Sequence, residues 1–257
     1  STIVLDRENS LNQIRALATI ISSITGKKRI PMLVIDSPAV LKDRDMFSAR
    51  GAGILGFSML ATKVEYALNT DMELNIDNVK KFSERYQNEP TLIFGFTFMI
   101  WEYFYKILSD STKSINLENA VMVHGGGWKK IEKQKIKRNT FNKLLNEKLN
   151  IKNVINYYGL VEQIGSIFFE CKCGYFIASN FSEIIIRDEN FKECKDGNSG
   201  FVQLISLLPT SYPGHNILTE DIGEIVKNHN CTCYGYGKRF LIHGRIKDAE
   251  LRGCSNI

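Results

Sequence analysis

The chain has 257 residues, of which 44% are hydrophobic, 11% aromatic and 24% charged, and its formal net charge is +5 at pH 7. This composition is ordinary for a globular protein, and the length allows one sizeable core or two subdomains, which excludes a disordered or fibrous chain. No run of eighteen apolar residues and no basic leader before an apolar stretch occurs, so we expect no membrane span, no secretory signal and a cytoplasmic location.

The first half of the chain alternates strand patterns with helix patterns, which favours a parallel α/β sheet. Helix patterns cover 10–24, with Ser10 as the N-cap and Gly26 as the stop, 77–88, with Asp77 as the cap, and 99–108. Strands are expected at 29–36, 62–67, 90–98 and 120–124.

A glycine-containing segment follows the first of these strands, at Ser48–Phe57. Its glycines predict a loop in which the backbone could come close to a ligand. Tight packing between elements explains the same glycines equally well.

Three glycines, Gly125, Gly126 and Gly127, come between the strand at 120–124 and a helix that we expect to open at Trp128. Such an arrangement presents backbone N–H groups and a helix dipole to an anion or a base edge. No Gly-Lys-Ser/Thr follows, so the segment is not a P-loop. We interpret His124, at the end of the strand, as a core histidine. The basic run at 128–148 is explained by a solvated helix face rather than by nucleic-acid binding.

The segment at 154–166 ends a strand on an aromatic pair and turns at Gly159. A ring such as that of Tyr158 can stack on a flat base, and the carboxylate of Glu162 can bind a divalent cation. The alternative is a core strand with a simple turn and a solvated Glu162.

Short strand patterns separated by glycine and asparagine turns fill the second half of the chain. They lie at 166–169, 175–178, 182–187, 200–207, 223–226 and 239–243. We therefore expect three parts: an α/β subdomain (1–165), a β-rich subdomain (166–243) and a hinge or C-terminal segment (244–257).

Four of the six cysteines form two Cys-x-Cys pairs in this β-rich half, each followed closely by a glycine: Cys171, Cys173, Cys231 and Cys233. Four thiolates can close a tetrahedral structural Zn²⁺ site, with His229 as a reserve ligand, although the spacer is shorter than the usual two residues. Disulfides or four separate buried thiols are the alternatives. Cys254 stands apart, two residues after an arginine that favours its thiolate.

Two later stretches extend the motif at Tyr158-Gly159-x-x-Glu162. They are Leu218-Thr219-Glu220-Asp221-Ile222-Gly223-Glu224-Ile225 and Ile242-His243-Gly244-Arg245-Ile246-Lys247-Asp248. In this order the three motifs resemble those of the adenylate-forming enzymes. The segments "SARGAGILGF", "LLPTSYPGH", "ILTEDIG" and the terminal "RGC" are similar to the acyl-protein synthetases of bacterial bioluminescence operons.

This resemblance implies ATP-dependent activation of a carboxylic acid, such as a fatty acid, as an acyl-adenylate that is then passed to a thiol. The thiol would belong to the protein itself, to a reductase or carrier protein, or to coenzyme A. By resemblance, Tyr158 stacks on adenine, Glu162 holds Mg²⁺, Asp221 binds the ribose and Arg245 contacts ribose or phosphate. The resemblance also implies that Gly125, Gly126 and Gly127 line the adenine and acyl pockets, that Lys247 and Asp248 form the hinge, and that Cys254 accepts the acyl group.

In the family, a Ser/Thr/Gly-rich phosphate loop precedes a strand like the one expected at Ser1–Leu5, so we expect the sequence to be a fragment. Two other functions stay open. One is a coenzyme A ligase of the phenylacetate type, and the other is a zinc-stapled binding module without catalysis.

Overall fold

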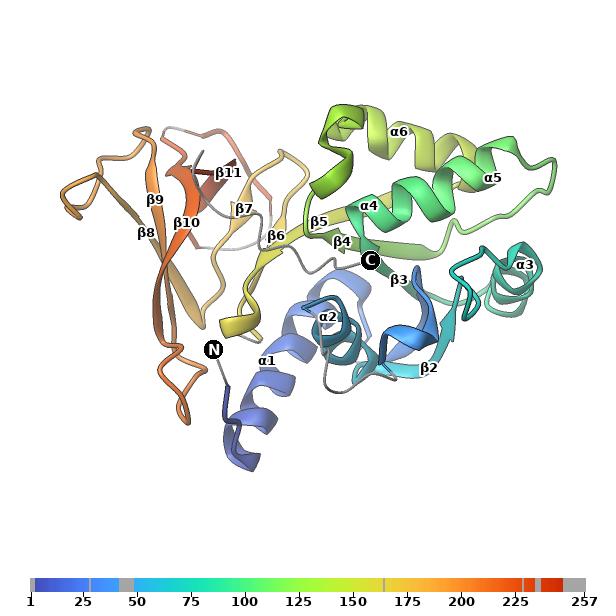
Figure 1. Cartoon of the computed structure of the whole chain (residues 1–257), viewed down its shortest axis with the longest axis horizontal. Helices are drawn as coiled ribbons and strands as arrows, with labels where there is room; N and C mark the ends of the chain where they lie inside the picture. The colour runs from blue at the N-terminus through green and yellow to red at the C-terminus, as the bar shows by residue number, and fades with distance from the viewer. Residues whose placement is uncertain are drawn as a thin grey trace. The chain divides into compact units, whose positions relative to one another are not determined.

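The computed structural model of the chain describes residues 3–27, 29–41, 49–163, 165–227, 229–233 and 237–246 (Figure 1). The described residues divide into two compact units. We call them the α/β unit, residues Ala18–Asn156, and the β unit, which combines the residues up to Leu17 with those from Tyr157 onward. No described helix combines the length and the apolar composition that crossing a lipid bilayer requires.

The α/β unit is built on a parallel sheet with the strand order β2 (Ala61–Tyr66), β1 (Ile30–Val34), β3 (Thr91–Phe96) and β4 (Ala120–Gly125). Every residue of β1, β3 and β4 is buried. Near-continuous apolar strands of this kind are typical of parallel sheets covered on both faces. The four expected strands of the first half are confirmed.

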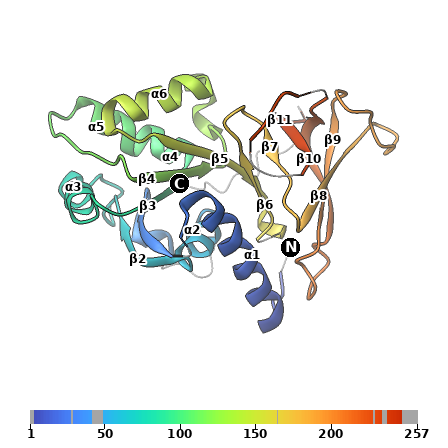
Figure 2. The same ribbon diagram turned by 180° about the vertical axis from the view of Figure 1, so that it is seen from behind.

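The helices of this unit cover both faces of that sheet, with α5 (Lys106–Asp110) and α6 (Arg138–Leu149) on one face and α2 (Ala49–Ser58) on the other (Figures 1 and 2). Consecutive residues of strand β3 point to opposite faces of the sheet and contact different helices. Ile93 joins the core cluster formed with α6 and α3 (Ile76–Arg85). The next residue, Phe94, points the other way and stacks on Phe57 of α2, with ring centroids 4.2 Å apart.

Three helix details differ from the sequence expectation. Helix α1 (Arg7–Thr25) begins before Ser10, because the side chain of Asp6 accepts a 2.7 Å hydrogen bond from the Asn9 amide. The N-cap of α3 is Asn75 rather than Asp77, which lies inside the first turn. The helix expected at 99–108 consists of α4 (Thr97–Met99), the π-helix η2 (Ile100–Tyr105) and α5. Gly26, at φ +71°, ends α1 as expected.

The loop expected at 48–57 is wrong for the described part of that range, which forms helix α2. Gly53 faces the sheet closely: a Cβ added there would lie 3.4 and 3.5 Å from the rings of Phe94 and Phe96. Of the two explanations for these glycines, packing between elements is the one that the contacts at Gly53 support. Ser48 lies outside the described residues.

Antiparallel strands form the β unit. Strand β5 (Asn153–Gly159) enters the unit at Tyr157, and the strands that follow it across the sheet are β6 (Ile167–Glu170), β7 (Phe176–Ile177), β11 (Arg239–Arg245), β10 (Asn216–Ile225), β9 (Gly200–Ser206) and β8 (Ser182–Arg187). Each expected strand of this half is present. Strand β10 is longer than the pattern at 223–226 predicted, so the Thr-x-Asp motif lies within a strand.

Alternating apolar residues of these strands form the core of the β unit. Ile184 and Ile186 of β8 meet Val202 and Leu204 of β9, and the cluster continues to Phe168, Phe176 and Phe240. The α/β class with a parallel sheet followed by a β-rich part is therefore confirmed. The domain limits at 165 and 243 stay predictions.

Candidate nucleotide site and cysteine cluster

Tyr158, near the end of β5, is held at both ends of its side chain. Its ring is packed by Phe168, Phe176 and Phe240, with centroid distances of 6.1, 6.1 and 6.3 Å. Its hydroxyl donates a 2.6 Å hydrogen bond to Oδ2 of Asp221. Burial, and then the negative charge of Asp221, raise the pKa of Tyr158. The phenol therefore stays protonated and serves as a fixed donor to the carboxylate.

Asp221, on β10, connects the second motif to the third. Its Oδ1 lies 3.9 Å from Nε of Arg245, at the end of β11, and Arg245 also pairs with Glu220. The two strands place these residues opposite one another, since Asp221 and Arg245 are register partners. The side chain of Asp221 is 17% exposed, so the carboxylate is oriented by protein groups and still reaches solvent.

Thr219 fixes the backbone at this point. Its hydroxyl donates to the Val202 carbonyl of β9 at 2.9 Å and accepts from the Asp221 amide at 3.1 Å. Thr219 and Glu220 also line a surface hollow of about 380 Å³ together with apolar side chains such as Phe201 and Leu218. The motif therefore contains an oriented carboxylate, that of Asp221, and two residues that line a partly apolar surface hollow.

Glu162 lies in the single turn η4 (Val161–Gln163), where its side chain is exposed to solvent. The residue after it was not among the expected site residues. Gln163 is buried, and its Nε2 donates to the carbonyls of Leu204 and Gly214 at 3.2 and 2.8 Å. These bonds anchor the turn that carries Glu162. A polar residue directly after the motif carboxylate was the only sequence signal for this role.

Asn9 is a second residue that the sequence interpretation missed. It is fully buried on α1, where its Oδ1 accepts from the amide of Thr210 at 2.8 Å and its Nδ2 donates to the Leu208 carbonyl at 3.1 Å. One turn later, Gln13 donates to the Tyr212 hydroxyl at 3.2 Å. Helix α1 therefore holds the "LLPTSYPGH" segment through polar side chains four residues apart, a spacing that apolar periodicity does not reveal.

The glycine triplet belongs to the α/β unit. Gly125 ends β4, and Gly126 and Gly127 adopt φ values of +74° and +65°. A Cβ on Gly126 would collide with the Phe96 ring, whereas a Cβ on Gly127 would meet no atom within 4 Å. The element after them is the short 3₁₀ helix η3 (Lys129–Gln134), not a long helix, so it supplies only a weak dipole.

His124 is a buried core residue, as its interpretation from the sequence proposed. Its Nδ1 lies 2.9 Å from the Thr97 hydroxyl, which also donates to the Gly125 carbonyl at 3.0 Å. Because the single hydroxyl proton goes to that carbonyl, Nδ1 of His124 carries the hydrogen of this pair. Burial, with a contribution from Arg138, lowers the pKa of His124 to about 3, so the ring is neutral.

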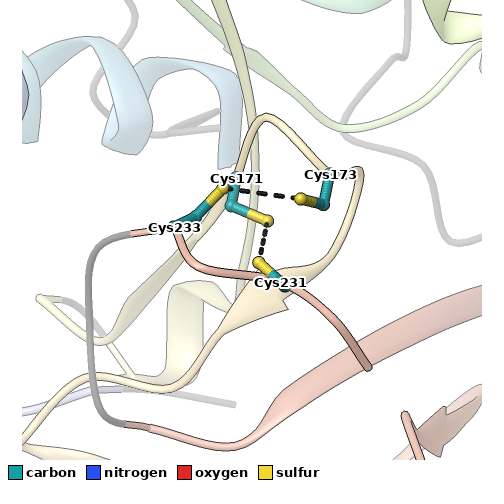
Figure 3. Close-up of side chains that lie close together, drawn as sticks. All are labelled: Cys171, Cys173, Cys231 and Cys233. Atoms are coloured by element: carbon teal, nitrogen blue, oxygen red, sulfur yellow. Dashed lines mark hydrogen bonds between the residues drawn. The ribbon is translucent and has the colours of Figure 1, made fainter. Parts of the chain in front are cut away.

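The four expected zinc ligands come together within the β unit. The thiols of Cys171 and Cys173, on the turn between β6 and β7, point toward those of Cys231 and Cys233, on the segment between β10 and β11 (Figure 3). All four sulfur atoms lie within 4.8 Å of one another. Cys194 is a free cysteine outside this group. His229 stands against Tyr175, with ring centroids 6.2 Å apart.

Three expected functional residues, Lys247, Asp248 and Cys254, lie outside the described residues. Their roles stay predictions. The structure thus brings together Tyr158, Asp221 and Arg245 in one place and the four cysteines in another. The roles proposed for Glu162 and for the glycine triplet stay predictions.

Coenzyme A ligases are among the solved structures with a similar fold. An open conformation of 2-hydroxyisobutyryl-CoA ligase in complex with 2-HIB-AMP and CoA matches with a TM-score of 0.66 at 14% identity, over 95% of this chain and 54% of that one. A long-chain-fatty-acid-CoA ligase (FadD1) from Archaeoglobus fulgidus matches with a TM-score of 0.60 at 14% identity, over 91% of this chain and 47% of that one. ATP-bound MatB from Rhodopseudomonas palustris matches with a TM-score of 0.55 at 13% identity, over 91% of this chain and 44% of that one.

The chain therefore spans about half the length of these solved structures, and at such identities the likeness establishes the fold alone. No curated protein matches the sequence. The family model "Acyl-protein synthetase, LuxE" matches residues 1–257, the whole of the sequence. This chain belongs to the LuxE acyl-protein synthetase family.

Proposed function

We propose that the protein activates a carboxylic acid with ATP and passes the acyl group to a thiol, with a fatty acid as substrate and a protein cysteine as acceptor. The observation that carries the proposal is the contact of Tyr158 and Arg245 with one carboxylate, that of Asp221. This contact joins three motifs that resemble those of adenylate-forming enzymes. Family membership supports the acyl-protein type of reaction.

The residues of the β unit fit a nucleotide. A partly exposed carboxylate with its orientation held by a phenol and a guanidinium can accept hydrogen bonds from both hydroxyls of a ribose. Arg245 adds a positive charge that suits a phosphate. The exposed Glu162, on a turn anchored by Gln163, can supply an oxygen ligand to Mg²⁺, which normally keeps several waters and binds one or two carboxylates.

The packing around Tyr158 limits its proposed role as a ring that stacks on adenine. Three phenylalanine rings surround that of Tyr158, and its hydroxyl is committed to Asp221. We therefore assign Tyr158 a positioning role toward Asp221 in addition to the proposed stacking on adenine. Residue 159 is a glycine because an added Cβ would lie only 3.2 Å from the side chain of Ile167, its register partner on β6.

The proposed chemistry has two steps. A carboxylate oxygen of the acid attacks the α-phosphorus of ATP, the bond to the β-phosphate oxygen breaks, and pyrophosphate leaves. A thiolate then attacks the acyl carbon, and AMP leaves with the electron pair of the acyl–oxygen bond. Cys254 is the proposed acceptor, and Gly125, Gly126, Gly127 and Lys247 are proposed nucleotide-site residues on the family resemblance.

Labelled fatty acid, ATP and Mg²⁺ incubated with the whole protein test this function. We expect label on the protein that neutral hydroxylamine removes, and none on a Cys254→Ser variant that still exchanges pyrophosphate into ATP. Equal label on the variant would place the acceptor elsewhere, with Cys194 as the next candidate. No label on either protein, with an acyl thioester formed on added coenzyme A, would establish the coenzyme A ligase instead.

A further inference from the structure

We propose that Cys171, Cys173, Cys231 and Cys233 bind one zinc ion as four thiolates, and that this ion fixes the segment from which strand β11 begins. The proposal concerns the β unit alone and does not depend on the proposed reaction. Its four ligands are described residues that come from two separate turns.

The sulfur spacing suits such an ion. Sγ of Cys171 lies 3.6 Å from that of Cys231, and Sγ of Cys173 lies 3.6 Å from that of Cys233, while all four stay within 4.8 Å. A zinc ion with Zn–S distances of about 2.3 Å in a tetrahedron separates its sulfurs by about 3.8 Å. The four thiols therefore already have close to the mutual distances of a tetrathiolate site, and only small side-chain shifts are needed.

The backbone around the first pair has the form of a tight knuckle. The Cys171 amide donates to the Tyr175 carbonyl at 2.8 Å, and the Gly174 amide donates back to the Cys171 carbonyl at 2.9 Å. Gly174 adopts φ +87°, which favours glycine at this place.

Disulfides are the competing explanation, joining Cys171 to Cys231 and Cys173 to Cys233. They require an S–S length of about 2.05 Å in each pair and place no demand on the distance between the two pairs. The observed cluster instead brings all four sulfur atoms into one group. Mutual proximity of four thiols is what a shared ion requires and what two independent disulfides leave unexplained.

The second pair is tied to the start of β11 by Arg239. This buried guanidinium donates to the Cys233 carbonyl at 2.9 Å and to the Gly237 carbonyl at 2.7 Å. Gly237 approaches the backbone of Ala178 so closely that a Cβ could not fit. A positive charge beside the cluster also offsets part of the net charge of −2 that four thiolates leave on a zinc ion.

A zinc ion here would therefore join the β6–β7 turn to the segment before β11. Strand β11 pairs with β7 through only two register positions, Arg239 with Ile177 and Phe240 with Phe176. The same strand ends at Arg245, opposite Asp221. An ion at the beginning of β11 would thus stabilise the strand that supplies the arginine of the candidate nucleotide site.

Metal analysis of the whole protein tests the proposal, with Cys173→Ser as the variant and Cys194→Ser as its matched control. We expect about one zinc per chain in the wild type and in Cys194→Ser, since Cys173 is a proposed ligand and Cys194 is not. In Cys173→Ser the bound zinc should be lost during dialysis against a mild chelator. Equal zinc in all three proteins would overturn the assignment, as would no zinc in wild type after reduction and reconstitution with Zn²⁺.

A measurement on the wild type protects the test against a variant that fails to fold. Replacing zinc with Co²⁺ should give the intense visible bands of a tetrahedral cobalt site and the near-ultraviolet charge-transfer absorption of several thiolates. Octahedral cobalt spectra would contradict four sulfur ligands. Mass spectrometry of the alkylated, unreduced protein that shows two disulfides between these cysteines and no bound metal would establish the disulfide alternative.

Discussion

Each of the two units contains an Asp–Arg pair, and the two pairs differ in surroundings. In the α/β unit, Asp36 and Arg50 form an ion pair 2.9 Å long, and both side chains are almost entirely buried. In the β unit, Asp221 and Arg245 are 3.9 Å apart, and their side chains are 17% and 41% exposed. The first pair is isolated from solvent, whereas the second remains accessible to a ligand.

The same contrast runs through the rest of each unit. The α/β unit depends on continuous apolar strands and on glycines that allow rings to pack closely, as at Gly53 and Gly126. In the β unit, polar side chains make contacts over long sequence distances, as Asn9 does with residues 208–211. We infer that close apolar packing dominates the α/β unit, whereas polar contacts in the β unit orient Tyr158, Asp221 and Arg245.

The largest effect on stability is expected from breaking the buried pair. Arg50→Met should lower the free energy of unfolding by about 3–5 kcal/mol at pH 8, because it leaves a buried carboxylate without its partner. Denaturant unfolding measures this loss. The control is Lys80→Met, which breaks an exposed pair with Glu84 and should cost at most about 1 kcal/mol. Equal losses in the two variants would show that burial of the Asp36 pair does not matter.

The same pair predicts a pH dependence. Burial raises the pKa of Asp36 from 3.8 to about 6, although Arg50 and the Ser37 amide oppose the shift. Between these values the folded state binds more protons than the unfolded state, so this group lowers stability as the pH rises from about 4 to about 6. In Arg50→Met the positive charge that lowers the pKa of Asp36 is lost. The decline in the free energy of unfolding should then extend above pH 6. A decline that ends at the same pH in both proteins would contradict this account.

The next effect on stability distinguishes the hydrogen bonds of Asn9 to residues 208–211 from the helix propensity of α1. Asn9→Ala should destabilise the protein by about 2–3 kcal/mol, because it leaves the buried Leu208 carbonyl and the partly buried Thr210 amide without the partner they have in the wild type. Hydrogen exchange should show faster opening of that segment. The control Asn12→Ala changes a half-exposed residue of the same helix, and exchange at 208–211 should then stay as in the wild type. Faster exchange in both variants would attribute the effect to the helix.

The smallest effect distinguishes two neighbouring glycines. Gly127→Ala should cost only about 1–2 kcal/mol, the strain of a left-handed residue, because open space surrounds the added Cβ. Gly126→Ala should cost more, since the added carbon also collides with the Phe96 ring. Thermal unfolding of the two variants makes the comparison. If Gly127→Ala proved the more damaging change, close packing against Phe96 would not explain why glycine is needed at 126.

Much of the fold could be predicted from the sequence, because strands such as Ile30–Val34 and Ala120–Gly125 are largely apolar and lie next to glycine or acidic residues. The helix at 49–58 was missed because a segment with three glycines is more typical of a loop, and the contact of Gly53 with Phe94 and Phe96 leaves no local sequence pattern. The cap at Asn75 was missed because Asp77, two residues later, is an equally common cap residue.

The candidate site was predictable in part. Tyr158, Asp221 and Arg245 were identified from motifs, and the structure adds the hydrogen bond that joins the first two. Gln163 and Asn9 could not be found, because their partners are backbone groups 41 to 202 residues away and leave no local pattern. The cysteines could be paired by spacing alone, whereas their convergence depends on how β7 and β11 align.

The central claim, that Asp221 binds the nucleotide, is tested most directly by calorimetric titration of the whole protein with ATP. Asp221→Asn keeps the shape of the side chain and removes its charge. Glu224→Gln makes the same change on the same strand outside the contact with Tyr158. We predict that ATP affinity falls about 10- to 100-fold in Asp221→Asn, as expected when a charge-assisted hydrogen bond is lost, and is unchanged in Glu224→Gln. Equal affinity of Asp221→Asn and the wild type would contradict the assignment of the nucleotide site to this carboxylate.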